Sequence, residues 1–312
     1  DESEFIHLYS KELENMYYTT PTAQNLYDNL NKFIKSHGEP VPDAATSAGY
    51  QLMPLVKKHA AVVLEGQGAD EILGGYQYFF GYFFKELFLK RQFAKLFKEL
   101  YSYLKTHRSI YGIKSFIYFS LPSTMKTKLS IYKNNILSDD FIKSYSHDNS
   151  IIKKLYGANS FRDALLFHFE LKLEHLLKWG DINSMTNSVE ARLPFLDHRL
   201  VEKTIASKHD VIKKGMTKII LRDALKDILP RKIRLRIDKM GYGTPQDSWL
   251  RDENFKKLIT DILESKSFNN RGIFDVIKVK KYYKQHLLGK VDHSEKIWKC
   301  INLELWFREF ID

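Results

Sequence analysis

Apolar side chains recur three or four residues apart through most of the chain, which is the spacing of one face of a helix. The first such pattern covers residues 3–16, with Ser3 as a candidate N-cap. The second covers residues 23–36 and is broken by the segment Gly38–Pro42, because proline removes backbone donors. A third helix is predicted at about residues 44–59.

A short β-branched run, Val62-Val63-Leu64, predicts a buried parallel strand. It ends at Gly66-Gln67-Gly68, which suits a sharp turn from strand to helix. Asp70 and Glu71 follow in the first helical turn. They can simply complement the helix dipole. They can also face a ligand, because open α/β sheets bind ligands beyond the carboxyl ends of their strands.

The chain is helical in pattern from residue 79 to residue 155, with a break at Leu121-Pro122-Ser123. We interpret this region as an all-helical insertion, in which no internal repeat is visible. A clearer helix follows at residues 161–178. The apolar face of a last helix carries Ile297, Ile301, Leu305 and Trp306.

Two further stretches combine charges with turn signals. In the first, Glu190 and Arg192 alternate with apolar residues, and Asp197 can cap the helix that follows. The second is Gly215-Met216-Thr217-Lys218, which precedes a predicted helix at residues 219–229. A lysine gains nothing from the dipole at a helix N-terminus, whereas its charge and the free N–H groups there can both bind a phosphate.

The cysteine content and the lengths of the apolar runs exclude several classes of protein. The 312 residues include one cysteine, Cys300, which excludes a disulfide framework and an all-cysteine metal site. The N-terminus has no signal-peptide pattern, and no apolar run reaches the 18 or so residues of a membrane span. We therefore expect a globular, cytoplasmic protein without a membrane partner.

The net charge of +11 is concentrated in residues 85–154, where 14 Lys and Arg stand against five Asp and Glu. The same residues are rich in Phe and Tyr, and such interleaving can stack nucleic-acid bases. At helical spacing, however, aromatic residues are more often core and lysines a solvated face. This pattern therefore does not favour nucleic acid as the partner.

Three strings of residues together resemble the asparagine synthase domain family, AMP-forming carbon–nitrogen ligases that include the glutamine-hydrolysing asparagine synthetases. The strings occur in the order expected of that family. They are Ala60 to Tyr76 with its Gly-Gln-Gly turn, Ser184 to Asp197, and the sequence of Gly215 to Lys218, Leu221-Arg222, Leu229-Pro230 and Arg236 to Pro245.

The resemblance implies a helix-rich α/β fold. It would hold a partial parallel sheet of the adenine-nucleotide-alpha-hydrolase type without its first strands, a helical insertion and a helical C-terminus. The implied domains are residues 1–76 for the remainder of the nucleotide-binding core, 77–160 for the insertion, 161–245 for active-site helices and loops, and 246–312 for the C-terminal region.

The resemblance also implies a reaction in which ATP, with Mg²⁺, activates a carboxylate such as aspartate as an acyl-adenylate that then receives ammonia. Lys218 would neutralise charge on the α-phosphate, and Glu190 nearby would orient the nucleophile or take its proton. The other implied site residues are Leu64, Glu65, Gly66, Gln67 and Gly68 for the nucleotide, Asp70 and Glu71 for the substrate, and Asp181, Arg192 and Lys239, with Glu71, as support; no metal ligand is assigned.

The family's pyrophosphate-binding loop, Ser-Gly-Gly-x-Asp-Ser, and its glutamine-hydrolysing domain have no counterpart in the sequence. We therefore expect the C-terminal portion of a synthetase, inactive by itself, that takes ammonia from a glutaminase domain outside this chain and could form a homo-oligomer. Two positions depart from the family pattern. Gln67 stands where the best-known members have glutamate and cannot act as a base. Ile182 replaces an arginine and removes an anion contact.

Three other functions stay open. Gln67 and Ile182 would suit a related synthetase that forms a different amide. The missing loop would suit a truncated, non-catalytic binding module. The basic segment at residues 85–154 would suit nucleic-acid binding, which should weaken steeply as salt rises.

Overall fold

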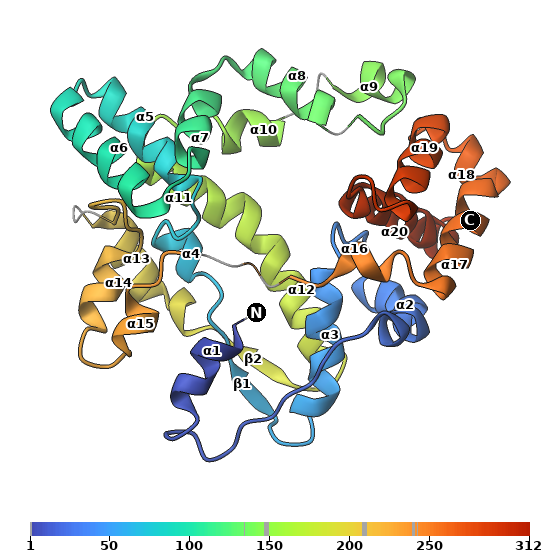
Figure 1. Ribbon diagram of the computed structural model, residues 1–312, viewed down its shortest axis with the longest axis horizontal. Coiled ribbons are helices and arrows are strands. Elements are labelled where there is room, and N and C mark those ends of the chain that lie inside the picture. The colour runs from blue at the N-terminus through green and yellow to red at the C-terminus, as the bar shows by residue number, and fades with distance from the viewer. Residues whose placement is uncertain (1, 134, 147–149, 208–210, 239–240, 242) are drawn as a thin grey trace.

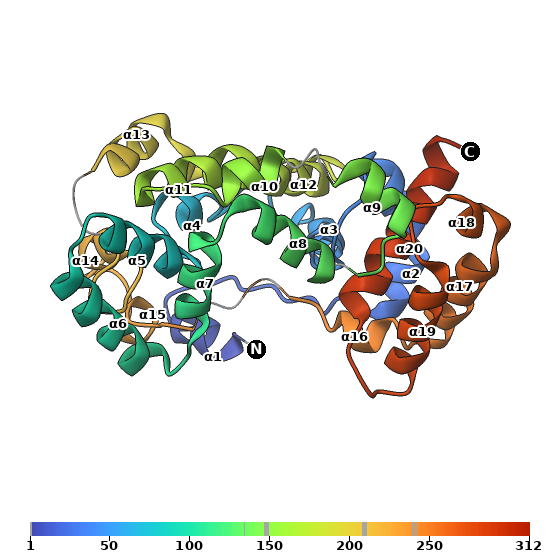
Figure 2. The same cartoon turned by 90° about the horizontal axis from the view of Figure 1, so that it is seen from above.

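The computed structural model describes residues 2–133, 135–146, 150–207, 211–238, 241 and 243–312. Helices dominate this part of the chain, together with a small parallel sheet (Figure 1). A nearly continuous helical rod runs along one side of the elongated molecule (Figure 2). It comprises α11 (Phe161–His168), the π-helical segment η2 (Phe169–Leu173) and α12 (Glu174–Met185). The predicted class, a helix-rich α/β fold with a partial parallel sheet, is confirmed.

The N-terminal segment contradicts the prediction of one long helix over residues 3–16. Only α1 (Ser3–Ile6) and the 3₁₀ turn η1 (His7–Tyr9) are helical. Glu2, and not Ser3, holds the N-cap position, without a side-chain capping bond. Leu13 stays 51% exposed, so no apolar face is buried. An isolated short helix is marginal without tertiary packing, which explains why the pattern alone was insufficient.

The second and third predicted helices are confirmed as α2 (Ala23–His37) and α3 (Ala45–Val56). Thr22 caps α2 by accepting a hydrogen bond from the Asn25 backbone, and Gly38 ends it in the left-handed conformation. The inner face predicted for α2 is buried against helices near the C-terminus. Its buried apolar residues are Leu26, Leu30, Phe33 and Ile34.

The sheet pairs β1 (Val62–Leu64) in parallel with β2 (Glu190–Arg192), so that Val62 lies opposite Glu190 and Leu64 opposite Arg192. The parallel strand was therefore predicted correctly, but its burial was not. Val62 is 49% and Leu64 74% exposed. A parallel strand is buried only when neighbouring strands and helices cover it. Among the described residues, β1 has β2 as its one strand neighbour.

The predicted insertion is helical. Its interior is aromatic, and α5 and α7 approach so closely that a Cβ on Gly81 would lie 2.7 Å from the Ser115 backbone. After the short α4 (Ala69–Ile72), its helices are α5 (Phe79–Leu89), α6 (Phe93–His107), α7 (Tyr111–Ser120), α8 (Ser123–Lys133), α9 (Asp139–Tyr145) and α10 (Ser150–Leu155).

The remaining helices form two groups at opposite ends of the molecule (Figures 1 and 2). Beside the insertion lie η3 (Pro194–Leu196), α13 (His198–Ala206), α14 (Ile219–Ala224) and α15 (Arg231–Arg234). At the other end, packed with α2, lie α16 (Gln246–Trp249), α17 (Glu253–Glu264), α18 (Lys266–Asn270), α19 (Val276–Leu287) and α20 (Ser294–Phe310).

Two helix boundaries differ from the sequence prediction. The helix predicted at residues 219–229 ends at Ala224, and the one predicted at residues 161–178 continues through η2 to Met185. The domain boundaries remain predictions. Within the described ranges, none of the helices combines the length and the apolar character that crossing a membrane would require.

Candidate active site

The turn after β1 joins two of the three family-like strings. Gly68 has φ +91, a conformation that favours glycine, and a Cβ there would lie 2.2 Å from Cδ2 of Leu196. The Glu65 N–H donates to the Arg192 carbonyl at 2.9 Å, which extends the sheet pairing beyond Leu64. Contact with the second string thus requires glycine at position 68, whereas nothing lies within 4 Å of a Cβ on Gly66.

An ion pair joins the first string to the third. Nζ of Lys218 lies 2.8 Å from Oδ1 of Asp70, and the two side chains are 22% and 15% exposed. Gly75 makes room for them, because a Cβ there would lie 1.8 Å from the Asp70 oxygen and 2.3 Å from Cε of Lys218. Glycine is therefore needed at position 75, because any side chain there would collide with the Asp70–Lys218 pair.

The pair faces a cavity of about 380 Å³, a volume suited to a small ligand. Cationic side chains from the third string are prominent in the lining of this cavity. The lining also includes carboxylates and ring-bearing side chains. Its charged and ring-bearing lining residues are Lys218, Arg222, Arg234, Arg236, His107, Asp70, Asp238, Glu2 and Phe80. Such a lining can accept an anion and, beside it, a cationic group.

Helix α6 of the insertion holds the loop that carries Lys218. A Cβ on Gly215, which has φ +70, would lie 2.7 Å from the Ser102 carbonyl oxygen. His107 Nε2 lies 2.8 Å from the Gly215 carbonyl oxygen, and Glu99 accepts from the Gly215 N–H at 3.4 Å. Burial lowers the pKa of His107, although its bond to Gly215 opposes that shift, so the ring is neutral at pH 7 with Nε2–H donating.

Arg222 ties the same loop to the segment after α15. Its guanidinium donates to the carbonyl of Thr217 at 2.7 Å, to that of Arg236 at 2.8 Å, and to that of Arg234. Arg236 in turn pairs with Glu2 at 2.7 Å. Arg222 is thus bound by three carbonyls, whereas Lys218 pairs with the Asp70 carboxylate.

Glu71 lies away from the cavity. It is 1% exposed and accepts a hydrogen bond from the Tyr76 hydroxyl at 2.7 Å. Burial, reinforced by the Glu71 charge, raises the pKa of Tyr76, so the hydroxyl stays a donor. The contact closes the short α4 turn beside Asp70. Glu71 is therefore bound to Tyr76 and does not line the cavity, and both roles suggested for it, substrate contact and support, stay predictions.

Other predicted residues lie outside the lining of this cavity. Glu190 starts β2, is exposed, and pairs with Arg192 at 2.7 Å. Gly66, Gln67 and Gly68 form the turn after β1, and Leu64 ends that strand. Glu65 is partly buried, which raises its pKa. Asp181 is exposed on α12, and Lys239 falls outside the described residues. The structure thus brings Lys218 to Asp70 but does not line the same cavity with Glu190.

Sequence reasoning missed several residues of this site. Arg222 and Arg236 stood inside quoted strings, so their signal was present but no role was assigned. Gly75 was likewise visible as part of a glycine pair. His107 and Glu99 carried no signal, because an insertion helix shows its contact with a loop more than a hundred residues away only after folding.

The described residues include no group of three or more His, Cys, Asp or Glu side chains that could hold a metal ion. Of the carboxylates that line the cavity, Asp70 is already paired with Lys218, and Glu2 and Asp238 are both paired with Arg236. The protein side chains described here therefore do not by themselves assemble a metal centre.

Comparison with known proteins gives the family. The family model described as asparagine synthase matches residues 1–308. The chain belongs to the asparagine synthase family. It is 28% identical over 319 residues to asparagine synthetase (glutamine-hydrolyzing) 1 of Bacillus subtilis, covering 91% of this chain and 46% of that protein. The recognition made from the three strings is thereby confirmed.

Two mycobacterial proteins are equally similar members of the asparagine synthase family. Over 295 residues the chain is 28% identical to proteins named putative asparagine synthetase (glutamine-hydrolyzing) in Mycobacterium bovis and Mycobacterium tuberculosis. The match covers 88% of this chain and 43% of each of them. The chain spans less than half the length of these curated relatives.

Proposed function

We propose that this chain is the C-terminal, carboxylate-activating portion of an AMP-forming amide synthetase, with aspartate and ATP as substrates and asparagine as product. The observation that carries the proposal is the Asp70–Lys218 pair at 2.8 Å, which faces a cavity rich in cations. A zwitterionic amino acid matches such a pair, since its ammonium can replace Lys218 on Asp70 while the lysine turns to an anion.

In the proposed reaction an oxygen of the substrate carboxylate forms a bond to the α-phosphorus of ATP, and the bond to pyrophosphate breaks. Lys218 neutralises negative charge on the α-phosphate as it develops. Ammonia then forms a bond to the acyl carbon, AMP leaves, and one proton is released. Lys218 stabilises the oxyanion of that second step.

ATP fits the basic lining described above by charge. The described residues include no group of three or more side chains that could hold Mg²⁺ by themselves. A magnesium ion commonly binds through substrate phosphates with only one or two carboxylates, which is compatible with this lining. The family relationship, and not a ligand set in this chain, is the reason to include Mg²⁺ in assays.

Ammonia is proposed to come from glutamine hydrolysis, because the relatives are named as glutamine-hydrolyzing synthetases. Cys300 cannot be the nucleophile for that hydrolysis, since it is fully buried and burial raises the pKa of its thiol. The hydrolysing residues would lie outside this chain. We expect the reaction in the cytoplasm, where ATP is available.

The test is aspartate-dependent exchange of radiolabelled pyrophosphate into ATP by the full-length protein that contains this chain. Exchange with aspartate and Mg²⁺, followed by asparagine formation when ammonia is added, would support the proposal. Exchange that depends on another carboxylic acid would favour the related synthetase suggested by Gln67 and Ile182. Absence of exchange with every acid, despite native folding, would refute carboxylate activation.

The role of Glu190 requires its own variant in the same assay. If its carboxylate takes a proton from the nucleophile, Glu190→Gln should lower asparagine formation more than pyrophosphate exchange, because the first half-reaction needs no base. Equal loss of both, or no loss, would contradict that role. Arg192→Gln serves as the control, since it leaves the Glu190 carboxylate in place while removing its ion-pair partner.

A further inference from the structure

Helix α6 has two apolar surfaces, and only one of them faces the protein. Its buried side carries Leu96, Glu99 and Tyr103. The other side carries four exposed side chains at helical intervals, here called the outer stripe of α6. The outer stripe consists of Phe93, Phe97, Tyr101 and Leu104, which are 46%, 69%, 68% and 40% exposed.

The outer stripe departs from the expectation that the aromatics of the insertion are core. Phe80 and Phe84 of α5 follow that expectation and are buried. Phe97 and Tyr101 do not, although they recur with the same helical spacing. Single exposed apolar residues need no explanation, but a row along one helix marks a surface for contact.

The charge around the outer stripe has one sign. Residues 88–108 contain six basic residues and a single acidic one, Glu99, which is buried. All six basic residues are exposed. They are Lys90, Arg91, Lys95, Lys98, Lys105 and Arg108. A partner that matches this surface would therefore combine an apolar region, into which the exposed rings can insert, with negative charge.

Against the expectation from composition that the protein has no membrane partner, we propose that the outer stripe of α6 docks on an anionic lipid surface. Figure 2 shows α6 at an outer edge of the molecule, where a planar surface can reach it. A helix with aromatic and leucine side chains on one side and lysines flanking them lies in the plane of the lipid headgroups. Such a contact needs no spanning helix, in agreement with the helices described.

Lipid fits these residues better than nucleic acid does. Leu104 offers no ring for stacking, and the stripe runs straight along the helix instead of following a curved phosphate backbone. The lysine charges add attraction to anionic headgroups within a Debye length of the surface. This inference does not depend on the proposed synthetase reaction.

The experiment is co-sedimentation of the full-length protein with vesicles of phosphatidylglycerol and phosphatidylcholine in about equal parts, and with vesicles of phosphatidylcholine alone. We expect binding at least about tenfold tighter to the anionic vesicles. The double variant Phe97→Asp with Tyr101→Asp should reduce that binding by about tenfold or more. Ile277→Asp on α19, at a position 83% exposed, is the control and should bind as wild type.

Lys98→Glu with Lys105→Glu tests the charge separately and should abolish the preference for anionic vesicles. Circular dichroism establishes that each variant is folded. Failure of the folded wild type to bind anionic vesicles would overturn the proposal, as would binding that the aspartate variant retains. Binding to RNA of equal charge but not to vesicles would overturn it in favour of nucleic acid. Protection of α6 from hydrogen exchange by the rest of the polypeptide would do so in favour of an internal contact.

Discussion

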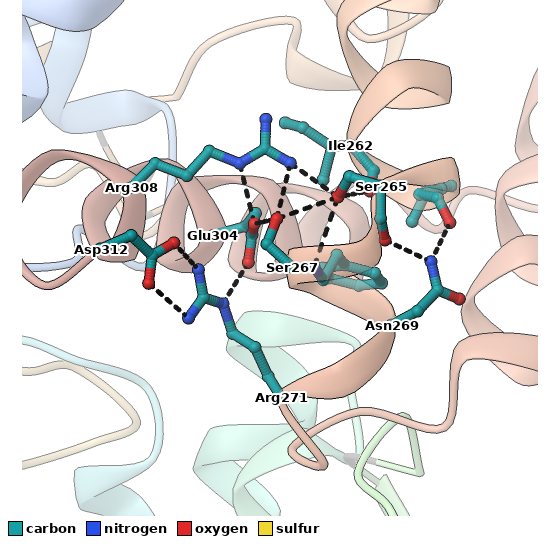
Figure 3. Close-up of polar contacts among 10 residues, drawn as sticks. Ile262, Ser265, Ser267, Asn269, Arg271, Glu304, Arg308 and Asp312 are labelled. Atoms are coloured by element: carbon teal, nitrogen blue, oxygen red, sulfur yellow. Dashed lines mark hydrogen bonds and ion pairs between the residues drawn. The ribbon is translucent and has the colours of Figure 1, made fainter.

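Two ionic clusters at opposite ends of the molecule invite comparison. At one end a single pair, Asp70 and Lys218, faces a cavity. At the other, Glu304 on α20 has a fully buried side chain and accepts from Arg271, Arg308 and Ser267 (Figure 3). Arg271 also pairs with Asp312, so both of its charged partners lie on or just after the same helix.

The difference lies in what remains for a ligand. One hydroxyl and two guanidinium groups satisfy the Glu304 carboxylate, from α18 with its C-cap and from α20 itself. Glu304 does not line the cavity described above. Lys218 and Asp70 have room beside them and can exchange partners. Chemistry is therefore expected where a charged pair borders open volume, and stability where each charge is already satisfied.

Disrupting the ion pairs around Glu304, here called the closed cluster, should give the largest effect. Glu304→Ala leaves Arg271 partly buried and without its central partner, and it should lower the free energy of unfolding by about 3–5 kcal/mol. Urea denaturation of the full-length protein measures this. Glu295→Ala on the same helix removes an exposed pair with Lys299 and should cost less than about 1 kcal/mol. Similar losses for both variants would contradict the distinction.

Disrupting the pair of Asp70 and Lys218, here called the open pair, should change turnover instead of stability. Lys218→Ala should slow the full-length enzyme by about 10²-fold or more, the scale for removing one group that stabilises transition-state charge. Lys218→Arg should also be impaired, because a planar fork does not replace a compact charge. Lys232→Ala, which removes an exposed lysine paired with Glu4, is the control. Turnover within about twofold of wild type for Lys218→Ala, with chemistry rate-limiting, would refute the role.

Adding a methyl group beside the open pair should show whether its geometry matters for turnover. Gly75→Ala places a methyl group where the Asp70 and Lys218 side chains now lie, so they must separate, and we expect turnover to fall by about tenfold. Gly180→Ala is the matched control, since its nearest neighbour would be 3.8 Å away, an ordinary contact. Steady-state kinetics of both variants measure the effect. Unchanged turnover for Gly75→Ala would show that the pair's geometry is not needed.

The smallest expected effect is a pH dependence confined to the closed cluster. Burial alone would raise the pKa of Glu304, but hydrogen bonds from Arg271, Ser267 and Arg308 outweigh it and lower that pKa. A lowered folded-state pKa stabilises the protein above the unfolded pKa, and this contribution is lost as pH falls through the folded value. The loss should therefore occur below about pH 4. Denaturation midpoints of the wild type should fall more steeply there than those of Glu304→Gln; parallel curves would contradict the assignment.

The sequence by itself determined the elements whose signals are local. The α2 helix has a capping threonine, a terminal glycine and four apolar residues on one face. Each of these signals can be recognised from residues that are close together in the sequence. The three strings likewise identified the family and directed attention to Lys218, because the residue types that bind phosphate or permit tight turns are written in the chain. The ion pair between Lys218 and Asp70 was not predicted, and the roles expected of the two residues stay predictions.

Tertiary structure alone decided which side chains have neighbours. Residues 3–16 and the outer stripe of α6 carry apolar patterns that look like those of α2, yet neither of them faces a core. Leu64 is exposed because covering a strand depends on elements far away in sequence. His107 reaches the Lys218 loop across a separation of 108 residues. A periodic pattern shows that a face is apolar, but burial is a property of two surfaces, and the second surface comes only with the fold.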